Sequence, residues 1–377
     1  MRTKIRFAVA ALAAGAAFGA QAVNNNWTGN PAVDGDWFQA SNWTLDHPPL
    51  AAEDVNLDPN NYADAIVISN ASQTAFANTL NASRTRLDIH TDLAVTNLYG
   101  YGYYPVLTQY GGTVSCRNFI MGVHNYPAST EATYRLEGGV LRATASFYMG
   151  RWSIGHFEQT GGVVELNGTP NGVYDKNGSS YTISGGSLVA TNGTFYCGDV
   201  SSASTTRQYL NLEGGTVKLD TLRVGGRHAQ GTLTVAGGTN DIKTLALGNW
   251  ASSKPILILR GSPDAGARFT VSGNVTFGDS TYKPTVALQA EINEHGVIPL
   301  TIQGNVTVHP NTTFLATAVD ADPGVYTVMT WGGTLSGAAN LLYGAETDFD
   351  RIAYTLDAVG KTLKVKVRAL ETVISIR

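Results

Sequence analysis

GGTVSCRNFIMG, at residues 111–122, is followed by a second copy of the same pattern, GGVLRATASFYMG, at residues 138–150. Each copy opens on a Gly-Gly pair, continues with an apolar residue at every second position and ends at a glycine. Gly-Gly pairs begin at residues 111, 138, 161, 185, 214 and 237, so the pattern recurs after 27, 23, 24, 29 and 23 residues. Self-similarity at such a period is typical of solenoid proteins, in which each repeat forms one rung.

Two short strands are predicted in each repeat, one on either side of the Gly-Gly pair. Apolar and polar residues alternate there with a period of two, as in strands that bury one face. After the pairs, the residues expected to point inward are Val114/Cys116, Leu141/Ala143, Val164/Leu166, Leu188/Ala190, Val217/Leu219 and Asn240/Ile242. Before the pairs, they are Leu107/Gln109, Tyr134/Leu136, Phe157/Gln159, Tyr181/Ile183, Leu210/Leu212 and Leu233/Val235.

A third short strand that ends at a glycine is predicted in five of the repeats. These strands are Phe119–Met121, Phe147–Met149, Phe195–Cys197, Leu222–Val224 and Leu245–Leu247. The repeat after Gly161 shows no clear third strand, and residues 167–172 are interpreted as a loop insertion. Glycine suits the corners between strands because it adopts positive φ without steric cost. The sequence therefore predicts an all-β fold, a β-helix (β-solenoid) with three short strands per rung.

Four regions are expected along the chain. Residues 1–22 have a basic start, an apolar run and a small–x–small pattern ending at Ala22, the features of a signal peptide, and predict export to the cell surface or beyond. Residues 23–65 contain Trp27, Trp37 and Trp43, interpreted as a cap over the open end of the core or, alternatively, as a stacking platform for sugar rings. Residues 66–260 hold the rungs, and residues 261–377 either continue the solenoid irregularly or form a β-sandwich-like cap.

Composition narrows the classes of partner and cofactor. Loss of the signal peptide removes three basic residues and no acidic residue, so the net charge of −4 becomes −7. Without a Lys/Arg cluster, such a chain is not expected to bind nucleic acid, and no transmembrane segment is expected after cleavage. Cys116 and Cys197 fall in separate inward columns and are interpreted as buried reduced thiols. We expect no cofactor. The alternative is a calcium ion bound by side-chain oxygens of Asp54, Asp58, Asn60, Asn61 and Asp64. The spacing of these residues does not match the usual calcium-binding loop.

The order of the motifs carries a resemblance to a known class of proteins. Trp27-x-Gly29, Gly35-Asp36-Trp37, Asn42-Trp43, Pro48-Pro49 and Asp54-Val55 precede the Gly-Gly rungs, and Gly324-x-Tyr326 follows them. This order resembles secreted β-solenoids of Gram-negative bacteria that are similar to autotransporter passengers and carry autotransporter-associated β-strand repeats. The resemblance covers nearly all of the mature chain. It implies export and an elongated, pectate-lyase-like right-handed β-helix, often with an adhesive role.

Loops after the third strand supply the candidate binding residues. Their shared glycine places them at one corner of the solenoid, so they are expected to stack along one edge. The candidate residues are His124, Tyr126, Arg151, Trp152, His156, Arg227, His228 and Trp250. Aromatic rings with Arg and His along a groove suit an acidic polysaccharide, through stacking and carboxylate contacts. The alternative is an ordinary solvated surface, and side chains that point apart with no shared groove would favour it.

Outward charges form a second pattern. Arg142 and Glu165 lie on adjacent rungs, as do Lys218 and Asp241, and each pair is predicted to meet across the ~4.8 Å spacing between strands. Such pairs hold the register, and a catalytic role is the alternative.

These observations favour an exported structural or adhesive protein of the cell surface or extracellular matrix, without catalysis and with end-to-end self-association possible. The alternatives are a carbohydrate-binding protein, and a polysaccharide lyase or hydrolase that uses the corner loops. A cleft that holds an Arg or Lys beside two or more carboxylates would favour the lyase.

Overall fold

A computed structural model describes residues 22–58, 64–101, 103–123, 130–174, 178–198, 206–227, 229–343 and 351–369. This part of the chain is all-β apart from two short 3-10 turns, η1 (Ala40–Asn42) and η2 (Ala338–Asn340). The strands form two sheets, sheet 1 with 19 strands and sheet 2 with 12. Named strand pairs in the described ranges are parallel, except β27 with β31 and β30 with β31 at the C-terminal end.

Sheet 1 contains β1 (Val23–Asn24), β2 (Glu53–Leu57), β4 (Ala75–Ala82), β6 (Leu93–Gly100), β8 (Thr113–Met121), β10 (Val140–Met149), β12 (Val163–Leu166), β13 (Asn171–Val173), β15 (Ser187–Cys197), β17 (Thr216–Val224), β19 (Thr239–Leu247), β21 (Arg268–Val271), β22 (Val275–Phe277), β24 (Leu300–Ile302), β25 (Val306–Val308), β27 (Gly324–Trp331), β28 (Leu335–Ser336), β30 (Ile352–Asp357) and β31 (Thr362–Val367). Sheet 2 contains β3 (Ala65–Ile68), β5 (Arg86–Ile89), β7 (Val106–Gln109), β9 (Glu131–Leu136), β11 (Ile154–Gln159), β14 (Ser180–Ile183), β16 (Thr206–Leu212), β18 (Ala229–Val235), β20 (Ile256–Arg260), β23 (Val286–Ile292), β26 (Thr312–Ala318) and β29 (Leu341–Tyr343).

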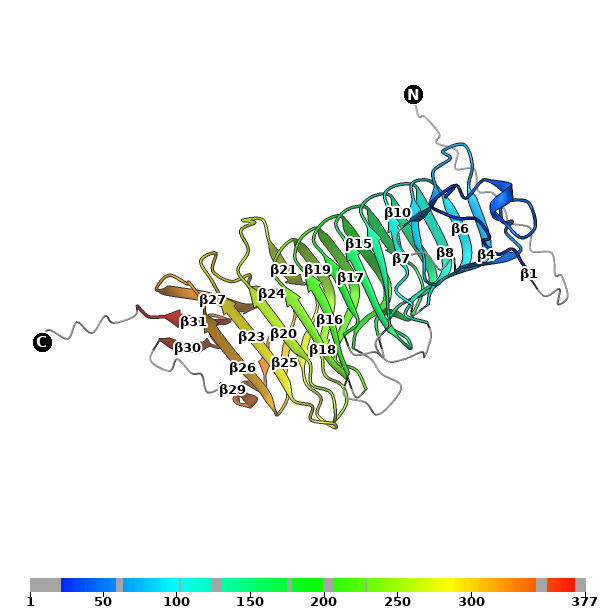
Figure 1. The fold of residues 1–377 in the computed structure, drawn as a ribbon. Helices are drawn as coiled ribbons and strands as arrows, with labels where there is room; N and C mark the ends of the chain where they lie inside the picture. Colours follow the sequence, from blue (N-terminus) through cyan, green and yellow to red (C-terminus); the bar gives the residue numbers. More distant parts are fainter. Residues whose placement is uncertain are drawn as a thin grey trace, which may run out of the picture.

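The chain alternates between the two sheets and returns to the same sheet once per rung (Figure 1). From β8 it passes through β9 in sheet 2 to β10, which pairs with β8 so that Leu141 lies beside Val114 and Ala143 beside Cys116. The register of this pairing shifts between Ala143 and Ser146. Each such rung therefore contains one long strand in sheet 1, which is split in two in the rung of β12 and β13, and one strand in sheet 2. The elongated stack in Figure 1 fits the β-solenoid that the repeat predicts.

Glycine is required at the corner that follows β9, where it is the second residue of a Gly-Gly pair. Gly139 has a φ of +74°, a conformation that residues with side chains rarely adopt. A Cβ atom at this position would lie 2.3 Å from the carbonyl oxygen of Gly112, in the rung before. The second glycine of the pair is thus fixed both by its own backbone conformation and by the close stacking of rungs.

The rung after Gly161 does have a third strand, so the prediction of a loop through residue 172 was wrong. Strand β13 places Asn171 between Phe147 and Phe195 in the parallel register. Asn171 is buried at the inward position that an aromatic residue occupies in the neighbouring rungs, and its Nδ2 donates to the Gly168 carbonyl at 2.5 Å. The Asn-Gly dipeptide hid the strand because both residues are ordinarily typical of turns.

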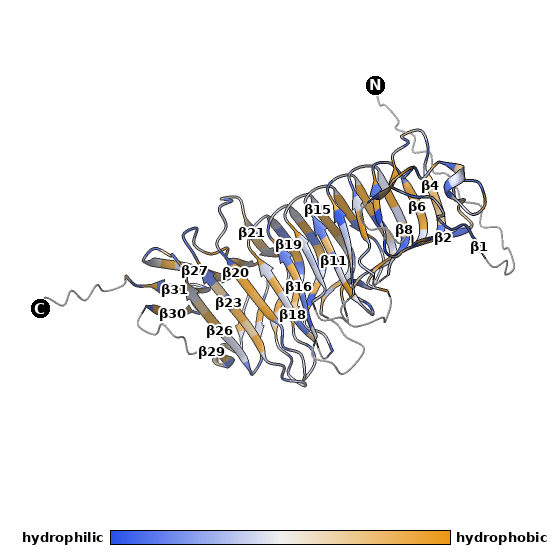
Figure 2. Cartoon of the chain, viewed as in Figure 1, coloured by the Kyte–Doolittle hydropathy of each residue, from blue (hydrophilic) through white to orange (hydrophobic). Residues whose placement is uncertain are grey.

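The core contains the residues that the alternation predicts to be inward. Every member of the predicted pairs on both sides of the Gly-Gly corners is buried, and Figure 2 shows apolar and polar residues interspersed along the strands. The buried side chain of Gln109 is fully engaged: its Nε2 donates to the carbonyls of Gly111, Gly112 and Val140, and its Oε1 accepts from the Tyr134 hydroxyl at 2.8 Å. The side-chain amide therefore satisfies the carbonyls of the corner that it faces.

Both cysteines are free and buried. They belong to different inward columns, because Cys116 lies beside Ala143 whereas Cys197 lies beside Val224. Burial raises the pKa of each thiol to about 12. The interpretation of both as buried reduced thiols is therefore confirmed.

Three tryptophans pack together at the N-terminal end. Trp27, Trp37 and Trp43 are at most 7% exposed, and the ring of Trp43 lies 5.1 Å from that of Trp27 and 4.7 Å from that of Trp37. Nearby, Asp36 pairs with Val67 of β3, so this segment extends sheet 2 beyond its first strand. Because the rings are buried and contact one another edge to face, they offer no open platform to a sugar.

Strands after Gly261 add to the same two sheets. Strand β21 pairs with β19 in sheet 1, and β23 pairs with β20 in sheet 2. Both sheets therefore continue into this part of the chain. At the far end β31 lies antiparallel between β27 and β30. No helix within the described ranges is long and apolar enough to cross a membrane.

Candidate functional site

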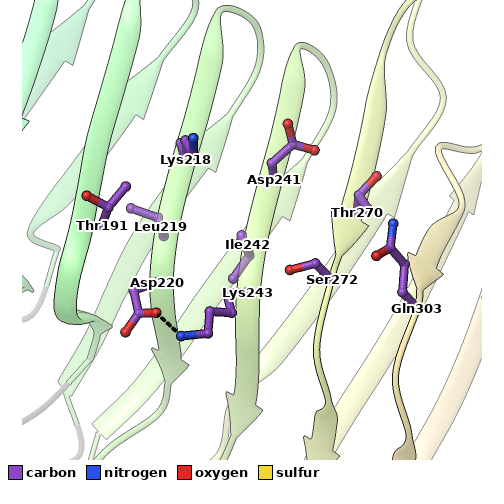
Figure 3. A pocket seen from close by; sticks show the side chains of 10 residues that line it. All are labelled: Thr191, Lys218, Leu219, Asp220, Asp241, Ile242, Lys243, Thr270, Ser272 and Gln303. Carbon is purple, nitrogen blue, oxygen red and sulfur yellow. Dashed lines mark hydrogen bonds and ion pairs between the residues drawn. The ribbon is translucent and has the colours of Figure 1, made fainter. Parts of the chain in front are cut away.

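A groove of about 640 Å³ lies on the outer face of sheet 1. Its residues come from consecutive rungs between β15 and the segment joining β24 to β25 (Figure 3). They are Thr191, Lys218, Leu219, Asp220, Asp241, Ile242, Lys243, Thr270, Ser272 and Gln303. Strand alternation explains the lining, because Leu219 and Ile242 fill the core while the residues on either side of each face outward.

Charges alternate in the groove both along the strands and across them. Strand β17 contributes Lys218 and Asp220, and β19 contributes Asp241 and Lys243. Lys218 is the register partner of Asp241. Lys243 Nζ donates to Asp220 Oδ1 at 2.9 Å, an ion pair drawn in Figure 3. The two cations therefore lie on one diagonal of a square and the two carboxylates on the other.

One of the two predicted outward ion pairs forms. Arg142 Nε lies 2.6 Å from Glu165 Oε2, which confirms the first pair. Lys218 and Asp241 stand side by side, but Asp241 Oδ2 accepts instead from Arg268 Nη2 at 3.3 Å. Arg268 is longer and reaches diagonally from the next rung. Among the described residues, Lys218 has no carboxylate within ion-pair distance.

Arginine and aromatic side chains of the predicted edge form two clusters. Arg151 lies over Trp152 and over the outward ring of Tyr148, with its guanidinium carbon 4.4 and 5.6 Å from the ring centroids. Arg227 lies over Trp250, at 5.1 Å. The loops that carry Arg151 and Arg227 are three rungs apart, about 14 Å. Each cluster is a cation–π contact at a corner of the solenoid.

The other predicted edge residues lie elsewhere. His156 belongs to β11 in sheet 2, where its Nδ1 is 2.8 Å from Ser180 Oγ and its Nε2 is 3.7 Å from Glu131. His124, Tyr126 and His228 lie outside the described residues. The described members therefore lie in two clusters and on sheet 2, and the predicted edge site stays a prediction.

Sequence reasoning missed a column of three tyrosines beside Arg151, of which Tyr148 and Tyr196 are half-buried and Tyr174 is buried. Tyr148, Tyr174 and Tyr196 follow one another along the stack, with ring centroids 4.6 and 5.7 Å apart. Tyr148 and Tyr196 are the middle residues of the Phe-Tyr-Met and Phe-Tyr-Cys third strands. Alternation places that middle position outward, which is the signal that would have found the column. The same signal applies to Asp220 and Lys243.

The acidic residues considered for calcium are engaged with other side chains. Asp54 Oδ1 accepts from Asn78, and Asp58 forms an ion pair with Arg84 at 2.9 Å. Asn60 and Asn61 lie outside the described residues. In the part of the chain that the structure describes, no group of three or more His, Cys, Asp or Glu side chains is arranged to hold a metal ion.

The chemistry of the groove suits a chain rich in hydroxyl groups. Thr270, Ser272 and Gln303 provide donors and acceptors, and Lys218 provides a cation for an anionic substituent. Asp220 and Asp241 each form an ion pair, with Lys243 and Arg268 respectively. Comparison with known proteins adds no assignment, since no family model, curated protein or solved structure matches the chain.

Proposed function

We propose that this protein is an exported, right-handed β-solenoid with an adhesive role at the cell surface or in the extracellular matrix, where it holds an acidic polysaccharide along the groove of sheet 1. The groove itself is the observation that carries this proposal. It runs parallel to the stack, so a polymer can follow it from rung to rung. Export is supported by the signal-peptide pattern of residues 1–22. The right-handed coil is supported by the strong preference of parallel crossovers for that hand.

Acidic polysaccharide is the class of ligand favoured by the charges. Lys218 is the groove cation that has no ion pair among the described residues, so a carboxylate of the ligand can bind there without displacing a partner. Lys243, in contrast, is already paired with Asp220. Hydroxyl and amide side chains on the following rungs suit the hydroxyl groups of the same chain. A ligand group at Lys218 gains a charge-assisted hydrogen bond.

Affinity electrophoresis in gels that contain a uronate-rich polysaccharide tests the proposal. We expect the mature protein, Val23 onward, to be retarded, and Lys218→Ala to lose most of that retardation. Lys254→Ala is the matched control, because Lys254 is also exposed and lies outside the groove. Equal retardation of Lys218→Ala and wild type, or none for wild type, would refute the groove as a binding site.

A polysaccharide lyase is the second candidate, because the groove places a lysine beside two carboxylates. Lys218 would abstract the proton next to a uronate carboxylate as general base. A hydrolase would need two carboxyl groups flanking the scissile bond, and the two groove carboxylates, Asp220 and Asp241, are both engaged in ion pairs with side chains of the protein. Lyase products absorb in the ultraviolet. Product formation that Lys218→Ala abolishes would establish the lyase over the adhesin.

A further inference from the structure

A second, smaller pocket opens on the outer face of sheet 2, away from the groove. It has a volume of about 270 Å³, below the ~300–1,000 Å³ that is usual for drug-sized ligands. Two tyrosines (Tyr104 and Tyr110), two arginines (Arg86 and Arg135) and Glu137 line it, together with threonine hydroxyls. We infer that this pocket binds a single neutral hexopyranose ring of a glycan, with its apolar face on tyrosine and its hydroxyl groups on the Arg and Glu side chains.

The aromatic walls are held in position. Tyr110 stacks on His90, with ring centroids 4.7 Å apart and planes 12° from parallel. Tyr104 has a φ of +59°, which is unfavourable for a bulky side chain, and it precedes Pro105, which further restricts its backbone. The Tyr104 backbone N–H donates to the Glu131 carbonyl at 2.9 Å, and the residue is 52% exposed. Strained residues that the surroundings hold in place cluster at ligand sites.

The polar walls are held too, and their charges select against an acidic sugar. Arg86 makes two hydrogen bonds with Asp88, from Nε at 3.2 Å and from Nη2 at 3.1 Å, and Arg135 pairs with Glu158 at 2.8 Å. Each guanidinium is thus neutralised but keeps other N–H groups for a ligand. Glu137 adds a further negative charge. Together, the two arginines, their two carboxylate partners and Glu137 carry one net negative charge. This charge disfavours a carboxylate on the ligand, and the side chains still offer donors and acceptors to hydroxyl groups.

This site does not depend on the groove of sheet 1, and its ligand differs in charge. The proposed groove ligand is anionic and binds at Lys218, whereas the pocket takes a neutral ring. The groove proposal and the pocket proposal can therefore be refuted independently of each other. Lys218→Ala, for example, should leave hexose binding at the pocket unchanged.

Saturation-transfer NMR with methyl glycosides of glucose, galactose and mannose, and with methyl glucuronide, tests the inference. We expect at least one neutral glycoside to bind in the range of about 1–10 mM, and the glucuronide at least tenfold more weakly. Tyr104→Gly should weaken binding at least tenfold. The same substitution should not lower the midpoint of urea unfolding, because glycine adopts positive φ without strain. Tyr104→Phe, which keeps the ring, should retain binding.

Lys283→Gly is the matched control for the backbone change. Lys283 is exposed, also has positive φ (48°) and does not line the pocket, so its replacement should leave binding unchanged. The inference is overturned if no neutral glycoside binds, if the glucuronide binds as well as they do, or if Tyr104→Gly binds like wild type.

Discussion

Replacement of Phe147 by alanine tests whether the stacked inward aromatics hold the rungs together. Phe147 is fully buried, and its ring centroid lies 5.1 Å from that of Phe119, 5.4 Å from that of Phe157 and 6.0 Å from that of Tyr181. These neighbours belong to different strands, each fixed in a parallel ladder, so they cannot collapse into the space left behind. Phe→Ala changes at such sites cost about 3–5 kcal/mol, and we expect about 4 kcal/mol here.

Urea unfolding followed by circular dichroism measures this cost. With a slope of about 3 kcal/mol per M for a chain of this size, the midpoint should fall by roughly 1 M. Phe76→Ala is the matched control, because Phe76 is 40% exposed on β4, and its loss should cost only about 0.5 kcal/mol. A loss below about 1 kcal/mol for Phe147→Ala would refute the reasoning that the inward column is a continuous packed core.

Two further predictions concern titration and register. Burial raises the pKa of Cys116 and Cys197 from 9.0 to about 12, so the stability that depends on their neutral thiols is complete below pH 9 and is lost as the pH rises toward 12. Urea midpoints measured from pH 8 to pH 10.5 should therefore fall less steeply for Cys197→Ala than for wild type, and parallel curves would contradict this. The Arg142–Glu165 pair, with side chains 48% and 37% exposed, should show a coupling of about 0.2–1 kcal/mol in a double-mutant cycle that shrinks in 1 M salt. A coupling above about 2 kcal/mol would contradict its assignment as a screened surface pair.

The rungs and the inward columns were predictable because they depend on local alternation and on one repeated corner. A residue such as Leu141 needs only its distance from the Gly-Gly pair to be assigned to the core. The third strand at Asn171 was not predictable in this way, because its inward residue is polar and its neighbour is glycine. The structure shows it through its pairing with Phe147 and Phe195, which the local sequence does not contain.

The sites were harder to predict than the fold. Alternation places Lys218 and Asp241 outward on neighbouring rungs, but it does not say that Arg268 reaches Asp241 from the following rung. The groove depends on the shape of the outer face across several rungs, and the sheet 2 pocket depends on the backbone of Tyr104, so neither follows from residue spacing. Among the predicted edge residues, Arg151 and Trp152 form one cation–π contact, and Arg227 and Trp250 form another. The sequence pattern does not show that these two clusters are several rungs apart.

A crystal structure of the mature protein with a bound oligouronate tests the central proposal most directly. We predict electron density for the oligosaccharide along the groove of sheet 1, with a carboxylate within hydrogen-bond distance of Lys218 Nζ and hydroxyl groups near Thr270 and Ser272. Density confined to the Arg151 or Arg227 clusters, with an empty groove, would contradict the proposal and would support the edge site instead.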